Sequence, residues 1–111
     1  MSCVRACPLS DLCVGEMRGF DLSGQRVVLI NEGGQVAAFA DRCAHQGVPI
    51  SEGRLRDGVI TCRAHEWQYD ARTGQGINPA STRLVRYPVE IRDGEIWVDV
   101  DVPIGGGNQG R

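Results

Sequence analysis

Both histidines of this 111-residue chain follow a cysteine at short spacing. The first pair is Cys43-x-His45 and the second is Cys62-x-x-His65. Four donors from two separate segments can meet only where the chain folds back on itself. Two thiolates and two imidazoles suit either a tetrahedral zinc ion or a mixed-ligand iron–sulfur cluster. The spacing therefore predicts two loops that converge on one metal site.

Three interpretations of these four residues remain open from spacing alone. They could be ordinary core or surface residues, although every histidine of the chain stands two or three places after a cysteine. They could bind zinc, but zinc sites of the Cys2His2 kind usually pair cysteine with cysteine and histidine with histidine along the sequence. The alternation of cysteine and histidine in this chain favours the third interpretation, a mixed-ligand 2Fe-2S cluster.

The rest of the pattern favours an all-β fold, because short apolar runs alternate with turn signals and helix signals are scarce. The continuous apolar run 27–30 predicts a strand that is covered on both faces. Hairpins are predicted at 32–35 and 93–94, because glycine and aspartate adopt the positive φ of tight turns. Strands are expected at 4–7, 16–21, 25–31, 36–39, 89–92 and 95–100, and a single helical turn at 8–12.

We expect residues 1–111 to form one domain, since this length is enough for one modest core. The outer segments, about 1–41 and 87–102, would form an antiparallel sandwich or barrel as the base. The segment 42–86 is dense in Gly, Arg, Cys and His and would be an inserted metal-binding part. Residues 103–111 have little to bury and are expected to form a flexible tail.

Composition excludes several classes of protein. Hydrophobic residues make up 41% and charged residues 23%, which argues against disorder and coiled coil. The net charge is −2 and the 12 cationic residues, all arginine, are spread along the chain, so no nucleic-acid or membrane surface is expected. No apolar run is long enough to cross a bilayer, and the start of the chain lacks the apolar core of a secretory signal. We therefore expect a cytoplasmic protein.

Three of the five cysteines stand apart from the two motifs. Cys3, Cys7 and Cys13 have no histidine nearby and no repeated CxxC spacing. A reducing cytoplasm also disfavours disulfides. We expect these three residues to be ordinary thiols with packing or surface roles.

The two motifs, with Gly47 after the first and Trp67 and Tyr69 after the second, resemble the Rieske 2Fe-2S domain. The resemblance covers nearly the whole chain. Three segments look especially like the ferredoxins of bacterial multicomponent diiron monooxygenases of the toluene type: 58–65, 76–79 and 87–90.

This resemblance implies a Rieske fold and one 2Fe-2S cluster. It implies that Cys43 and Cys62 bind the inner iron, and that His45 and His65 bind the outer, more exposed iron through Nδ1. Respiratory Rieske proteins carry a further cysteine in each cluster loop, which this chain lacks, so the resemblance points away from a membrane respiratory complex. Many Rieske ferredoxins also have glycine directly after the second histidine, where this chain has Glu66.

The function implied by the resemblance is that of a soluble, monomeric one-electron carrier and not of an enzyme. It would pass electrons from an NAD(P)H-dependent flavoprotein reductase to the hydroxylase of an aromatic or alkene monooxygenase. The alternatives within electron transfer are the ferredoxin of an aromatic-ring dioxygenase and a small subunit like that of nitrite reductase. The alternative of another class is a structural zinc-binding interaction module. Once both histidines are ligands, none remains for acid–base catalysis.

Several residues near the two motifs have expected roles at the cluster or at its docking surface. Pro79 would either shield the cluster or form a simple turn. Trp67 would lie on the same face as His65 if that segment is extended. It would then pack beside the cluster loop, and the alternative is a plain core tryptophan rather than one that contacts a partner. The surface bearing His45 and His65 is the expected docking site. Three charged residues are candidates for steering a partner: Arg42, Arg63 and Glu66.

Overall fold

The computed structural model describes residues 3–42, 48–63, 66–78 and 80–101. Short strands in these ranges form antiparallel sheets, and two 3-10 turns accompany them, η1 (Leu9–Asp11) and η2 (Ile50–Glu52). Neither these turns nor any other helix in the described ranges has the length and apolar character needed to cross a bilayer. The predicted all-β fold is confirmed.

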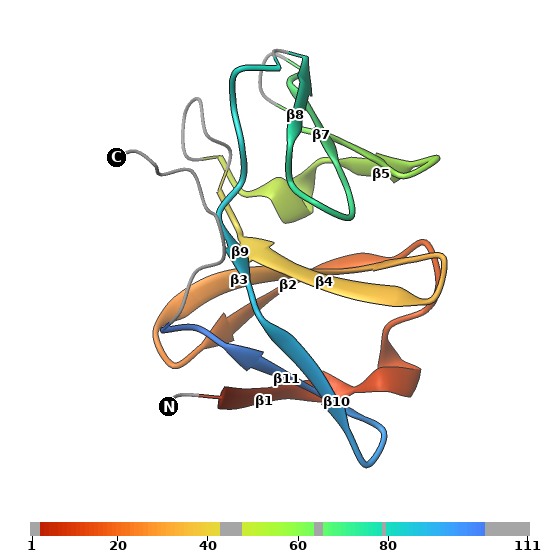
Figure 1. Ribbon diagram of the computed structural model, residues 1–111, viewed down its shortest axis with the longest axis vertical. Helices are drawn as coiled ribbons and strands as arrows, with labels where there is room; N and C mark the ends of the chain where they lie inside the picture. Colours follow the sequence, from red (N-terminus) through yellow and green to blue (C-terminus); the bar gives the residue numbers. More distant parts are fainter. Residues whose placement is uncertain (1–2, 43–47, 64–65, 79, 102–111) are drawn as a thin grey trace.

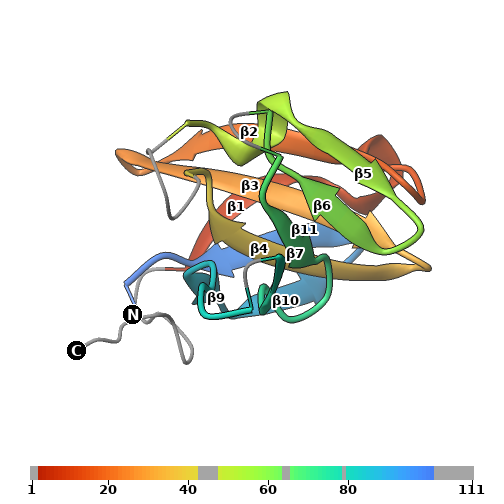
Figure 2. The ribbon, with the colours of Figure 1, turned by 90° about the horizontal axis from the view of Figure 1, so that it is seen from above.

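Three sheets are stacked in layers, with the second sheet in the middle (Figures 1 and 2). The first sheet has the order β1-β11-β10 and consists of β1 (Cys3–Pro8), β10 (Val89–Arg92) and β11 (Glu95–Asp99). The second has the order β2-β3-β4-β9 and consists of β2 (Met17–Leu22), β3 (Gln25–Glu32), β4 (Gln35–Ala40) and β9 (Arg86–Tyr87). The third has the order β5-β6-β7-β8 and consists of β5 (Arg54–Arg56), β6 (Val59–Thr61), β7 (Gln68–Asp70) and β8 (Gly76–Asn78).

Strand β3 runs through the middle layer and is buried on both faces. Val27, Val28, Leu29 and Ile30 have no exposed surface. Because successive side chains of a strand point to opposite faces, Val28 and Ile30 pack toward the third sheet and Val27 and Leu29 toward the first. The prediction of a strand covered on both faces is confirmed.

Two apolar cores follow from this layering. The upper core, between the second and third sheets, contains Val28, Ile30, Ala37, Phe39, Ile50, Ile60, Cys62, Tyr69, Ala71 and Leu84. The lower core, between the second and first sheets, contains Cys7, Leu12, Leu22, Val27, Leu29, Ala38, Tyr87, Ile96, Val98 and Val100. The upper core thus joins the third sheet, which carries Cys62 at the end of β6, to the rest of the molecule.

The predicted hairpins are present. Gly33 and Gly34 have φ of 64° and 94°, and Asp93 and Gly94 have φ of 50° and 76°, as left-handed two-residue turns require. The sequence did not predict the strands β5 to β8 within segment 42–86. Each of them is only three residues long, which is too short for a repeating hydrophobic pattern to be recognised.

Candidate metal centre

Of the four predicted ligands, Cys62 is the one that the structure describes. Cys43, His45 and His65 lie outside the described residues, as do Gly47 and Pro79. Cys62 is the first residue after β6 and has no exposed surface. It lies in the upper core, two residues after Ile60 and on the same side of the extended chain. A metal-bound thiolate at this position would be shielded from water by apolar side chains.

The segment that carries Cys62 and His65 connects β6 to β7. The strands stay in register up to the base of this connection, where Thr61 pairs with Gln68 and the Cys62 N–H donates to the Trp67 carbonyl oxygen at 2.8 Å. Cys62 and Trp67 are thus the paired residues at the base of the β6–β7 connection. We call residues 62–67 the second ligand segment.

The backbone just before Trp67 is not extended. Glu66 has φ of 54°, in the left-handed region, so the chain turns sharply just before Trp67. The condition under which Trp67 would share a face with His65, an extended segment, is therefore not met at Glu66. Trp67 is half-buried and packs against the upper core.

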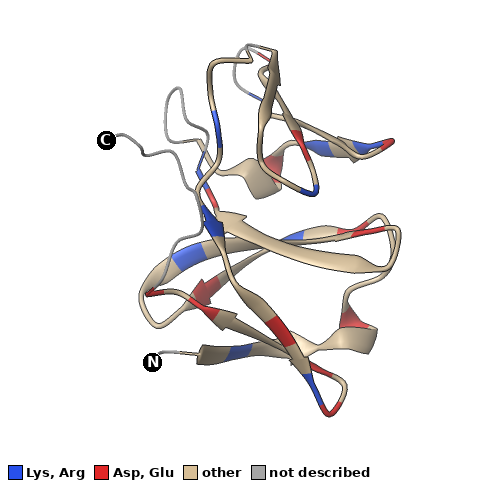
Figure 3. Ribbon diagram, in the orientation of Figure 1, with Lys and Arg blue, Asp and Glu red and all other residues tan. Residues whose placement is uncertain are grey.

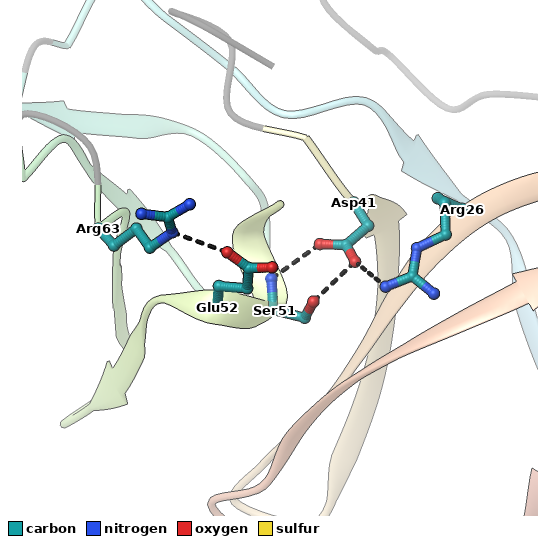
Figure 4. A network of polar contacts seen from close by, with 5 residues as sticks. All are labelled: Arg26, Asp41, Ser51, Glu52 and Arg63. Atoms are coloured by element: carbon teal, nitrogen blue, oxygen red, sulfur yellow. Dashed lines mark hydrogen bonds and ion pairs between the residues drawn. The ribbon is translucent and has the colours of Figure 1, made fainter. Parts of the chain in front are cut away.

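The first ligand segment, residues 42–50, is held together at its two ends. Asp41 follows β4, and Ser51 lies in η2. The Asp41 carboxylate accepts hydrogen bonds from the Ser51 backbone N–H and from Ser51 Oγ, both at 2.7 Å. Arg26 donates to the same carboxylate through Nη2 at 3.0 Å (Figure 4). These contacts close the base of the segment that contains Cys43 and His45.

The second ligand segment is joined directly to η2, the turn at the end of the first segment. Nε of Arg63 lies 2.7 Å from Oε1 of Glu52, so the residue after Cys62 is paired with η2 (Figure 4). Gly53 allows the close approach, because a Cβ there would overlap the carbonyl oxygen of Thr61 and would lie 3.3 Å from Cα of Cys62. The described ends of both segments therefore lie side by side.

The three predicted steering charges differ in their surroundings. Arg42 and Glu66 are exposed, as expected. Arg63 is also exposed, but its ion pair with Glu52 shows that it is not an isolated surface charge. The pair contributes little to stability on its own because both side chains are more than half in solvent.

Sequence reasoning missed the residues that hold the segments in place. Asp41, Ser51 and Glu52 are ordinary loop residues by type, and no spacing rule pairs them. Tyr69 was noted only as part of a resemblance, yet it is fully buried in the upper core together with Cys62. The one available signal was the position of Asp41, which lies two residues after the predicted strand 36–39 and two residues before Cys43.

The other three cysteines lie away from Cys62 in the described structure. Cys3 and Cys7 belong to β1 in the first sheet, on the far side of the middle sheet from β6 (Figure 1). All three are free; Cys7 is buried, Cys3 is half-buried and Cys13 is exposed. Burial raises the pKa of the Cys7 thiol, and the carboxylate of Asp11 adds to this effect.

Comparison with known proteins agrees with this arrangement. The sequence profile described as "Rieske [2Fe-2S] domain" matches residues 2–88. The ferredoxin component of the alkene monooxygenase system of Xanthobacter autotrophicus is 39% identical over 99 residues, covering 88% of this chain and 81% of the relative. The ferredoxin subunit of the 3-phenylpropionate/cinnamic acid dioxygenase of Escherichia coli K12 is 35% identical over 102 residues, covering 90% of this chain and 95% of the relative.

Solved structures show the same fold. The ferredoxin of carbazole 1,9a-dioxygenase from Nocardioides aromaticivorans matches with a TM-score of 0.80 at 28% identity, over 88% of this chain and 97% of that one. A chain in the complex of reduced oxygenase and oxidized ferredoxin of carbazole 1,9a-dioxygenase matches with a TM-score of 0.81 at 29% identity. The match covers 87% of the present chain and 92% of that one. The match of the family model to most of the chain, the identity to these ferredoxins and the layered fold show that the chain belongs to the Rieske 2Fe-2S domain family, and its cofactor is a Rieske-type 2Fe-2S cluster.

Proposed function

We propose that this chain is the ferredoxin component of a multicomponent aromatic or alkene monooxygenase. It is an electron-transfer component and not itself an enzyme. It would accept electrons from an NAD(P)H-dependent flavoprotein reductase and deliver them to the hydroxylase. The observation that carries this proposal is the 39% identity to an alkene monooxygenase ferredoxin along 81% of that relative.

We propose Cys43, His45, Cys62 and His65 as the cluster ligands. The structure supports this set at Cys62, which is a buried thiol at the start of a tightly closed turn. The two ligand segments have neighbouring bases, joined by the Glu52–Arg63 ion pair, as four converging ligands require. When bound, the cluster takes up and releases one electron.

The donor set itself favours easy reduction. Two neutral imidazoles in place of two thiolates remove two negative charges from the ligands, so adding an electron becomes less unfavourable. Rieske centres have potentials of roughly −150 to +300 mV, against about −400 mV for plant-type clusters with cysteine ligands alone. By the resemblance, Cys43 and Cys62 would hold the inner iron, while His45 and His65 would face the docking surface.

The proposal also covers the organisation of the chain, its localisation and its oligomeric state. Segment 42–86 would be the cluster-binding part, with the base formed by about 1–41 and 87–102, and 103–111 would be a tail. The protein would act as a cytoplasmic monomer that docks transiently. Short-lived complexes suit an electron carrier, because it has to dissociate from the reductase before it binds the hydroxylase.

Spectroscopy tests the ligand set. Dithionite-reduced protein is expected to give the EPR signal of a Rieske centre, with iron and acid-labile sulfide in equal amounts. The His65→Ala variant should lose this signal while circular dichroism still reports folded β-sheet. An intact Rieske signal in that variant would remove His65 from the set, and stoichiometric zinc without iron in chelator-free wild-type protein would overturn the proposal.

Reconstituted turnover tests the partner. We expect NAD(P)H-driven hydroxylation when the chain is combined with a reductase and the hydroxylase of an alkene monooxygenase. The 35% identity to a dioxygenase ferredoxin along 95% of its length makes an aromatic-ring dioxygenase the second candidate. Higher turnover with a dioxygenase than with the monooxygenase hydroxylase would select this second function.

A further inference from the structure

A polar network around one buried carboxylate lies at the base of the first ligand segment. It consists of Arg26, Asp41 and Ser51, and we call it the clasp. The Asp41 side chain has no exposed surface although it is a carboxylate, whereas 55% of the Arg26 side chain is exposed. A buried carboxylate is costly unless hydrogen bonds and a cation compensate it. The two hydrogen bonds from Ser51 and one from Arg26 provide this compensation.

The geometry of the clasp restricts both ends of the first ligand segment. Ser51 is held through its backbone N–H by one carboxylate oxygen and through its hydroxyl group by the other. Contacts to both oxygens define the orientation of Ser51 relative to Asp41 as well as their separation. Asp41 is itself attached to β3, since its N–H donates to the carbonyl oxygen of Arg26 at 3.0 Å. The segment 42–50 therefore starts and ends at defined points.

A glycine in the neighbouring strand leaves space for the clasp. Gly19 lies inside β2, where glycine normally weakens a strand. A Cβ at this position would lie 2.5 Å from Arg26 Nη2, 2.8 Å from Asp41 Oδ2 and 2.9 Å from Ser51 Oγ. All three clasp residues would have to move to accept a methyl group. This close approach accounts for glycine at a position where no turn requires it.

We propose that Asp41 and Ser51 are positioning residues for the cluster, acting through the segment that carries Cys43 and His45. This inference rests on the proposed ligand roles of those two residues. Outer groups that orient metal ligands typically change metal affinity by about 10- to 100-fold when they are removed. The negative charge of Asp41, two residues before Cys43, also opposes the addition of an electron nearby.

A general contribution to stability is the competing explanation, and the molecule offers a matched control for it. Asn31 is the other buried polar residue in the described ranges. Counted over the whole residue, backbone included, Asn31 is 5% exposed and Asp41 is 4% exposed. Its side chain donates to the Leu12 carbonyl oxygen at 2.8 Å and accepts from the Gly34 N–H at 3.0 Å. It lies at the β3–β4 turn, at the opposite end of these strands from Asp41.

The test uses three variants that disturb the clasp, Asp41→Asn, Ser51→Ala and Gly19→Ala, which we call the clasp variants. Each is compared with Asn31→Ala in the cluster-loaded protein. Loss of visible absorbance in excess EDTA gives the rate of cluster loss, and urea unfolding gives the stability of each variant. We expect the three clasp variants to lose the cluster about 10- to 100-fold faster than Asn31→Ala at equal stability. Ser51→Thr keeps both donors and should restore a rate near that of the wild type.

The reduction potential provides a readout that stability alone does not move. Asp41→Asn should raise the potential because it removes a buried negative charge, whereas Asn31→Ala should leave the potential unchanged. If Asp41→Asn does not fold, Ser51→Ala and Gly19→Ala still test the clasp with the carboxylate present. Cluster loss no faster than in Asn31→Ala would overturn the inference.

The two proposals fail in different ways. A wild-type protein without a Rieske EPR signal would contradict the ligand set of the proposed function. A wild-type protein with that signal, together with clasp variants that match Asn31→Ala in both rate and potential, would contradict the clasp alone.

Discussion

The Arg63 guanidinium and the Glu52 carboxylate lie 2.7 Å apart and link the second ligand segment to η2, the turn at the end of the first segment. Both side chains are more than half exposed, so solvent screens the pair. We predict that Arg63→Gln or Glu52→Gln lowers the free energy of unfolding by less than about 1 kcal/mol. A double-mutant cycle in urea at low and at high salt measures the coupling, which should shrink as salt is added. Coupling that is large and independent of salt would contradict the prediction.

Gly53 is predicted to be the least replaceable glycine near the site. Its own φ of −88° suits any residue, but a Cβ would overlap the Thr61 backbone. Gly53→Ala should therefore destabilise the fold by about 2–4 kcal/mol, because backbone cannot rotate out of the way as a side chain can. Gly24→Ala is the control, since it has open space and φ of 85°, and should cost only about 1–2 kcal/mol. Urea unfolding of both variants measures these losses in the free energy of unfolding. Equal losses in Gly53→Ala and Gly24→Ala would contradict the steric argument.

Glu66 occupies a backbone position that favours glycine. With φ of 54° it pays the penalty of a left-handed conformation. Glu66→Gly is predicted to stabilise the fold by about 1 kcal/mol. Glu66→Ala removes the same carboxylate and keeps the penalty, so it should not stabilise. Chemical unfolding separates the two variants, and an equal gain from both would assign the effect to the lost charge instead.

The three cysteines outside the ligand set should differ in reactivity. Cys13 is exposed and Cys7 is buried, and burial raises the pKa of the Cys7 thiol. At neutral pH we expect iodoacetamide to modify Cys13 first, Cys3 more slowly and Cys7 only on unfolding, as read by mass spectrometry. Rapid labelling of Cys7 in the folded protein would contradict its placement in the lower core.

The raised pKa of Cys7 also sets a direction for stability at high pH. A thiol with a higher pKa in the folded state keeps its contribution below the unfolded value of about 8.5 and loses it as the pH rises further. The free energy of unfolding should thus fall above this value. Cys7→Ala should flatten that fall, because the variant has no thiol at this position to titrate. Unfolding curves in denaturant at several alkaline pH values measure the difference.

Local sequence chemistry was enough for the strands and turns of the base. The apolar run Val27–Ile30 predicted a strand buried on both faces, and Asp93-Gly94 predicted a tight hairpin. The structure confirms both. These features depend on residues that are neighbours in the chain, so their periodicity and their φ preferences are visible in the sequence. The short strands β5 to β8 were not predicted, because three residues carry too little pattern.

The family and its cofactor were likewise accessible from the sequence, through the resemblance that the two cysteine–histidine pairs and the residues after them carry to the Rieske domain. The surroundings of the pairs were not. The hydrogen bonds of Asp41 to Ser51, the space left by Gly19 and the close approach of Gly53 to Thr61 join residues from different elements. Such contacts exist only after three sheets have packed, since the distance between two side chains depends on the path of the whole chain between them. The sequence alone thus determined the donor types and the strand pattern, while the tertiary structure decided how the ligand segments are held.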